Sequence, residues 1–210
     1  MAGLLVFAVL GGYVLISVLI VYRVLRAAPQ KKLVAGVLAT LVVTLPVTTM
    51  FWEYVQTKRT FERYCREEAK VTIFKTVEQW KKENPGVAET LQPYTDKNRP
   101  AYQYSGDGLY NTSSTEYLNR RFALIKKEKV IQSSNVFRQT NEVVDTETSN
   151  IMIRWVDYRS GYGNPFLGTP YGFKSYKVWL STTGCSSHDK SVDLFFDYIE
   201  LIKNIGGEQP

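Results

Sequence analysis

The stretch Val136-Phe-Arg-Gln-Thr-Asn-Glu-Val-Val144, together with Ile151-Met-Ile-Arg-Trp-Val-Asp-Tyr158, decides the fold of the larger part of this chain. The polar turn formers of residues 145–150 separate these two β-prone runs, a pattern that predicts a β-hairpin. Apolar side chains occupy both alternating faces of the second arm: Ile151, Ile153 and Trp155 on one, Met152 and Val156 on the other. We therefore expect the second arm to lie inside its sheet.

The sequence on either side adds further elements. Runs 71–77, 122–132 and 173–180 are expected to be strands, whereas 92–108 is expected to be a loop and 114–118 a helical turn. Thr76 and Gln79 match a capping box that begins a short helix. Apolar residues at helical spacing predict a final helix: Val192, Phe195, Phe196, Ile199 and Ile202. The sequence thus predicts an α+β domain over 57–210, with a mainly antiparallel sheet of four or five strands and a C-terminal helix.

The first part of the chain has a different composition. Residues 4–22 and 33–52 are uncharged runs of 19 and 20 residues. About 20 apolar residues in a helix cross a bilayer core, and a backbone in lipid must satisfy its own hydrogen bonds. We therefore expect residues 1–56 to form a two-helix transmembrane hairpin, and residues 54–70 to extend the second helix as a stalk.

The charges indicate an orientation. All four basic residues before position 53 lie between the two runs, namely Arg23, Arg26, Lys31 and Lys32. A short basic loop favours the cytoplasmic side. The expected location is thus the bacterial inner membrane, with the soluble domain facing the periplasm or exterior.

The hairpin can pack in two ways. Small residues recur at four-residue spacing in each run, as Ala8 and Gly12 and as Ala35 and Ala39, which allows close helix contact. The two helices can pack on each other, or they can form a homo-oligomer with other copies. Neither run carries a charge, which argues against a transporter or pump.

Net charge excludes another class of protein. The chain carries a formal charge of +6, of which residues 1–52 contribute +4 and the remaining 158 residues only +2. A nearly neutral domain lacks the positive charge on which nucleic-acid affinity depends, so no nucleic-acid partner is expected.

Few residues suit catalysis. The only histidine is His188, three residues after Cys185 and next to Asp189. A metal site or a cysteine nucleophile can be drawn there, but zinc sites need three or four ligands, and Asp189 suits the start of the final helix. The sequence has no phosphate-loop, dinucleotide or hydrolase motif. We expect no catalytic residue, metal or cofactor.

The two cysteines are more informative as a pair. In an oxidising compartment, two cysteines tend to form a disulfide. A bond between Cys65 and Cys185 would join the stalk helix to the segment before the final helix. The alternative is two unrelated buried thiols.

The segment 158–173 carries the candidate partner-binding residues: Tyr158, Arg159, Tyr162, Phe166 and Tyr171. Tyrosine, phenylalanine and arginine are enriched at interface hot spots. Tyr162 and Phe166 are the expected exposed anchors, whereas the alternative is that the rings fold back over the sheet.

These observations predict a membrane-anchored, non-enzymatic interaction module of bacterial type. Its partners would be the lipid bilayer and another envelope protein, as in an envelope-complex accessory, immunity or exclusion-type protein. The alternative is a membrane-anchored sensor or small-ligand-binding domain, and an enzyme is the weaker third possibility.

Overall fold

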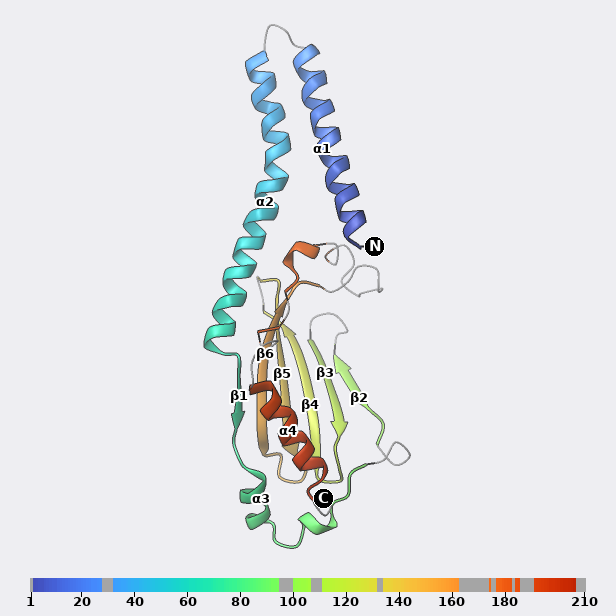
Figure 1. Ribbon diagram of the computed structural model, residues 1–210, viewed down its shortest axis with the longest axis vertical. Coiled ribbons are helices and arrows are strands. Elements are labelled where there is room, and N and C mark those ends of the chain that lie inside the picture. Colours follow the sequence, from blue (N-terminus) through green and yellow to red (C-terminus); the bar gives the residue numbers. More distant parts are fainter. Residues whose placement is uncertain are drawn as a thin grey trace. The chain divides into compact units, whose positions relative to one another are not determined.

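The structure is a computed structural model that describes residues 2–27, 32–94, 100–106, 111–131, 134–162, 174, 177–182, 184–185 and 191–206. It divides into two compact units, Met1–Gln56 and Thr57–Pro210. Helix α1 spans Ala2–Ala27, and helix α2 spans Lys32–Glu67, so α2 belongs to both units (Figure 1).

Helices α1 and α2 contain the two uncharged runs of the sequence. Several large apolar side chains of both helices are exposed, among them Leu15, Ile16, Leu33, Leu45 and Phe51. Among the described residues, no helix is both long enough and apolar enough to cross a membrane. The transmembrane character expected from the sequence is therefore not supported by the structure.

The second unit contains a six-stranded sheet in which every pair of neighbours is antiparallel. Its strands are β1 (Lys70–Ile73), β2 (Gln103–Gly106), β3 (Asn111–Tyr117), β4 (Phe122–Val130), β5 (Val136–Asp145) and β6 (Ile151–Ser160), in the order β1-β6-β5-β4-β3-β2. The predicted α+β class and the antiparallel sheet are confirmed, but the sheet has six strands instead of the four or five expected. Strand β6 lies between β1 and β5, as the apolar residues on both of its faces indicated.

Three local expectations were wrong. Strand β2 lies inside the expected loop 92–108, and β3 includes the expected helical turn 114–118. Both strands have few apolar residues, so their sequences show no strand pattern. Strand β2 is an exposed edge strand, and β3 is held mainly by its pairing with β4. Within the expected strand 173–180, Val178–Leu180 instead forms a 3₁₀ turn, and residues 173, 175 and 176 lie outside the described part.

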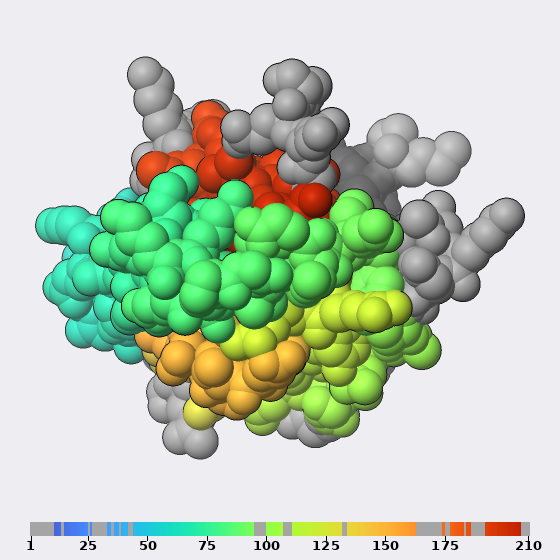
Figure 2. All heavy atoms as spheres, turned by 90° about the horizontal axis from the view of Figure 1, so that it is seen from below, coloured from blue at the N-terminus to red at the C-terminus, as the bar shows by residue number. Residues whose placement is uncertain are grey.

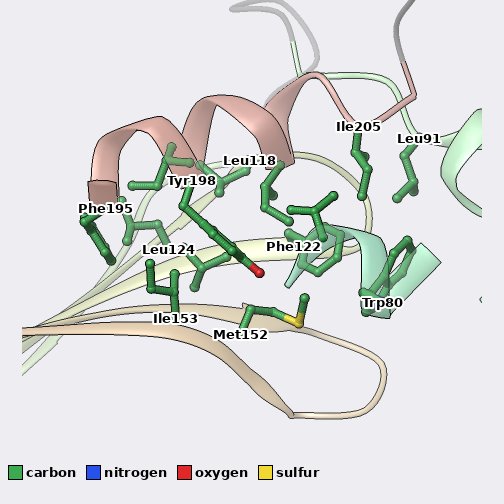
Figure 3. Packing of buried hydrophobic residues seen from close by; sticks show 14 of the residues in the cluster. Trp80, Leu91, Leu118, Phe122, Leu124, Met152, Ile153, Phe195, Tyr198 and Ile205 are labelled. Atoms are coloured by element: carbon green, nitrogen blue, oxygen red, sulfur yellow. The ribbon is translucent and has the colours of Figure 1, made fainter. Parts of the chain in front are cut away.

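The main core lies on one side of the sheet, which we call the helix face. Helix α4 (Ser191–Lys203) lies across this face, with α3 (Val77–Glu83) and the short turn η2 (Ala88–Thr90) beside it (Figure 3). The buried side chains come from all these elements and include Trp80, Phe122, Ile153, Phe195 and Ile202. Thr76 caps α3 through the expected capping box, and α4 confirms the predicted final helix.

The opposite side of the sheet, which we call the stalk face, has its own core. Val136, Val156 and Tyr158 are buried there against Phe61 and Tyr64 from the end of α2. Strand β6 is consequently covered on both sides, by α4 on the helix face and by the stalk on the other.

A buried ion pair closes one end of the sheet. The Arg121 guanidinium makes two hydrogen bonds to Asp145, of 2.7 and 3.0 Å, and the Trp80 indole donates to the same carboxylate at 3.0 Å. Asp145 is only 1% exposed. The segment that holds α3 and η2 covers this end of the sheet (Figure 2). The pair therefore fixes β4, β5 and α3 together.

Burial alone would raise the pKa of Asp145, but the hydrogen bonds from Arg121 and Trp80 outweigh it and hold the pKa below the ordinary value of 3.8. A lowered folded-state pKa stabilises the fold fully above the unfolded-state pKa. That contribution is lost as the pH falls below about 3.8 toward the folded-state pKa.

We predict that Asp145→Asn will lower the free energy of unfolding by about 3 kcal/mol at pH 7, because the buried Arg121 charge loses its buried carboxylate and keeps only the exposed Glu147. The variant should also lose stability less steeply than the wild type as the pH falls from about 5 to about 3, because it lacks the titrating Asp145 carboxylate. Denaturant titrations of both proteins across this range, followed by tryptophan fluorescence, measure both effects.

Glu147→Gln is the matched control. Glu147 pairs with the same guanidinium, but its side chain is 68% exposed, so its loss should cost less than about 1 kcal/mol. Equal losses in the two variants would contradict the assigned role of Asp145.

Candidate functional site: a sheet groove and a stalk junction

The alternation of side chains along β4 and β5 leaves a polar gap on the helix face. On β5, Phe137 and Val143 are buried, and Gln139 and Asn141 lie between them on the same face. On the neighbouring strand β4, Lys126 and Glu128 lie between apolar residues at both ends; their partners in register are Asn141 and Gln139. Apolar clusters therefore cover the two ends of the helix face and leave its middle to polar residues.

This gap is a groove with a volume of about 430 Å³, which we call the sheet groove. Its polar floor consists of Thr112, Ser114, Lys126, Glu128, Gln139 and Asn141. Its aromatic wall consists of Tyr102, Tyr104, Trp155, Phe195 and Phe196. Three of these rings are strongly exposed: Tyr102 at 60%, Tyr104 at 58% and Phe196 at 53%. The volume lies within the range of small-molecule sites in proteins.

The charges of the sheet groove are balanced within the fold. Lys126 lies 3.4 Å from Glu116, and Glu128 forms an ion pair with Arg159. The Arg159 guanidinium also lies over the Phe137 ring, 4.3 Å from its centroid. The groove thus offers neutral hydrogen-bonding groups and rings, with no net charge from these two pairs.

The stalk junction lies on the other face of the sheet. Cys65 of α2 and Cys185 are joined as a disulfide, with their Cα atoms 5.4 Å apart and a sequence separation of 120. The Tyr64 and Tyr158 rings stack with centroids 5.0 Å apart. The pairing expected from the sequence is therefore confirmed in the structure, and it attaches the segment before α4 to the stalk.

Polar contacts add to this junction. The Tyr158 hydroxyl donates to Glu68 at 2.6 Å, and Asn135 donates to the Thr57 hydroxyl at 3.1 Å. Burial, reinforced by the hydrogen bond to the Glu68 carboxylate, raises the pKa of Tyr158 well above its ordinary value. The Tyr158 hydroxyl consequently stays protonated and serves as a structural donor.

The candidate partner-binding residues do not form one exposed patch. Tyr158 is fully buried on the stalk face, whereas Arg159 pairs with Glu128 on the helix face. Tyr162 is only 6% exposed and donates to Asn135 at 2.5 Å, so the expectation of an exposed anchor at this position was wrong. Its ring packs on Phe137 instead. Phe166 and Tyr171 lie outside the described residues.

The residues considered for catalysis or metal binding in the sequence do not form a site within the described part of the chain. His188 and Asp189 lie outside the described residues, and Cys185 is in the disulfide. Across the described ranges, no group of three or more histidine, cysteine, aspartate or glutamate side chains could hold a metal ion.

Sequence reasoning missed the sheet groove. One signal was present: polar pairs sit between apolar residues at alternating positions of two neighbouring strands, 126 with 128 and 139 with 141. This signal becomes visible only with the strand register. Two further floor residues, Thr112 and Ser114, lie on β3, and the helical turn expected at 114–118 obscured that strand.

We predict that the double variant Cys65→Ser/Cys185→Ser will have a free energy of unfolding about 4 to 5 kcal/mol below that of the oxidised wild type, because a bond across such a long loop restricts the unfolded chain. Denaturant titration measures the difference. A reductant should destabilise the wild type and leave the double variant unchanged. Two alkylatable thiols in the natively purified wild type would contradict the disulfide.

Comparison with known proteins gave no relative on which to base a function. No family model matches this sequence, and no similar protein was found among curated proteins or solved structures.

Proposed function

We propose that this protein is a membrane-anchored, non-enzymatic interaction module whose second unit faces the periplasm or exterior of a bacterial cell. Its partners are the lipid bilayer and another envelope protein, in the manner of an envelope-complex accessory, immunity or exclusion-type protein. The observation that carries the proposal is the Cys65–Cys185 disulfide in a chain that begins with two uncharged helical runs.

The membrane part of the proposal is supported by the sequence. Residues 4–22 and 33–52 carry no charge, and each run is helical throughout. Exposed apolar side chains such as Leu19, Leu41 and Phe51 are costly in water and favourable in lipid. The small residues at four-residue spacing in these helices would also allow two copies of the chain to pack together as a homo-oligomer.

The orientation has two independent supports. The basic residues between the runs favour the cytoplasm, which places Trp52 and everything after it on the other side. Disulfides persist in oxidising compartments and are rare in the cytosol, so the Cys65–Cys185 pair favours the same side for the second unit.

A second candidate function is a membrane-anchored domain that binds a small ligand. The sheet groove favours it, because it combines a polar floor with exposed aromatic rings in a volume suited to such a ligand. Both candidates share the anchor and the orientation, and they differ in whether the bound species is a protein or a small molecule.

We predict that an alkaline phosphatase fused after Pro210 will be active in bacterial cells and that a fluorescent reporter restricted to the cytoplasm will be inactive there. The basic residues before Leu33 supply the physical reason. Fusions after Lys32 are the control and should give the opposite pattern. A fluorescent fusion at Pro210 with an inactive phosphatase would refute the orientation.

We predict that the full-length protein, extracted in mild detergent, will co-purify with a stoichiometric envelope protein. A few buried central residues supply most of the binding energy of a protein interface, so a specific partner should stay bound in mild detergent. Quantitative mass spectrometry of tagged protein against an untagged strain measures the enrichment. Purification of the chain without an enriched protein, after crosslinking in intact cells, would exclude the interaction module and leave the ligand-binding candidate.

A further inference from the structure

The sheet groove has unused hydrogen-bonding capacity. Among the described residues, four floor side chains make no side-chain hydrogen bond to one another or to any neighbour: Thr112, Ser114, Gln139 and Asn141. Hydroxyl and amide groups both donate and accept. Their strands are adjacent, with Thr112 facing Glu128 and Asn141 facing Lys126 across the β3–β4 and β4–β5 ladders. The floor therefore presents a row of donors and acceptors at fixed spacing.

The wall of the groove supplies flat apolar surface. The Tyr102 and Tyr104 rings stand at the β2 side, and the Trp155 ring lies at the β6 side. The Trp155 ring is held in place by Phe195 and Phe196, with centroid distances of 5.4 and 6.0 Å. Aromatic side chains offer a large rigid contact area, and tyrosine adds a polar tip.

The paired charges of the groove further restrict the chemical class of ligand that it can bind. Phosphate and carboxylate groups are recognised by arginine or lysine side chains, and here Lys126 and Arg159 already pair with Glu116 and Glu128. A lipid chain would need an apolar floor, whereas this floor is polar. The remaining chemistry is an uncharged molecule that carries many hydroxyl or amide groups and also has apolar faces.

We propose that the sheet groove binds a neutral oligosaccharide. Pyranose rings have apolar faces that stack on aromatic side chains, and their hydroxyl groups hydrogen-bond with amides and hydroxyls such as those of Gln139 and Asn141. This inference deepens the ligand-binding candidate above and rests on that candidate, although binding itself does not require the proposed orientation.

The test uses full-length protein and two neutral probes, chitotetraose and maltotetraose, in isothermal titration calorimetry. The protein is kept in a zwitterionic detergent, because the headgroups of alkyl glycosides would compete for the groove. At least one probe should bind with one-to-one stoichiometry. Gln139→Ala/Asn141→Ala should weaken binding about tenfold or more through the loss of two hydrogen bonds, and Tyr104→Ala should weaken it as well.

Thr140→Ala is the matched control, since Thr140 lies between these two residues on the stalk face; it should leave the affinity unchanged. The melting temperatures of all variants show whether each one is folded. The proposal is overturned if neither probe binds up to millimolar concentration, or if binding persists in the folded Gln139→Ala/Asn141→Ala variant. The reporter fusions at Pro210 test the orientation separately. A negative binding result therefore leaves the orientation standing, and a wrong orientation leaves oligosaccharide binding standing.

Discussion

The burial of β6 on both faces is the constraint on which the second unit depends. Its odd-numbered residues Ile153 and Trp155 pack under α4, and its even-numbered residues Val156 and Tyr158 pack against the stalk. A one-residue slip in register would exchange these two sets. It would place Arg154 under α4 and Trp155 against the stalk, so the two cores fix the register from opposite sides.

Two different features reinforce this arrangement at the ends of the sheet: polar contacts at one end and a glycine turn at the other. Arg121 and Asp145 hold the β4 start to the β5 end, and Asn119 links the same corner to α4 by donating to the Ile202 carbonyl at 3.0 Å. At the other end, Gly161 has a φ of 86°, and a Cβ there would lie 2.6 Å from the Ser181 Cα. Only glycine allows the chain to turn so close to that backbone.

The sequence predicted those elements whose residues carry a local apolar pattern. The β5–β6 hairpin, β4, α3 with its capping box, and α4 all have such a pattern, and all were predicted with the correct type. Strands β2 and β3 do not, because Asn111-Thr-Ser-Ser-Thr-Glu-Tyr117 is polar at almost every position. Their pairing is set by β4, which is tertiary context that no local window contains.

The candidate sites also differ in how far the local sequence could predict them. The disulfide was predictable because the chain has only two cysteines and each has a clear place in sequence. The aromatic residues of 158–162 were harder, because composition does not reveal which side of a strand a ring occupies. Tyr158 and Arg159 are neighbours in sequence, yet alternation places them on opposite faces of the sheet.

That alternation also connects the two sites. On β6, Tyr158 contacts the stalk, while Arg159, one residue later, balances the Glu128 charge in the sheet groove. Trp155 lines the groove from the same strand. Strand β6 pairs with β1 at residues 153–156 and with β5 at Tyr158 and Arg159, and it is packed on both faces, so a shift at one of these residues disturbs the other. The Trp155 side of the groove is therefore held at a fixed position with respect to the end of the stalk within the second unit, which is the rigidity that selective binding requires.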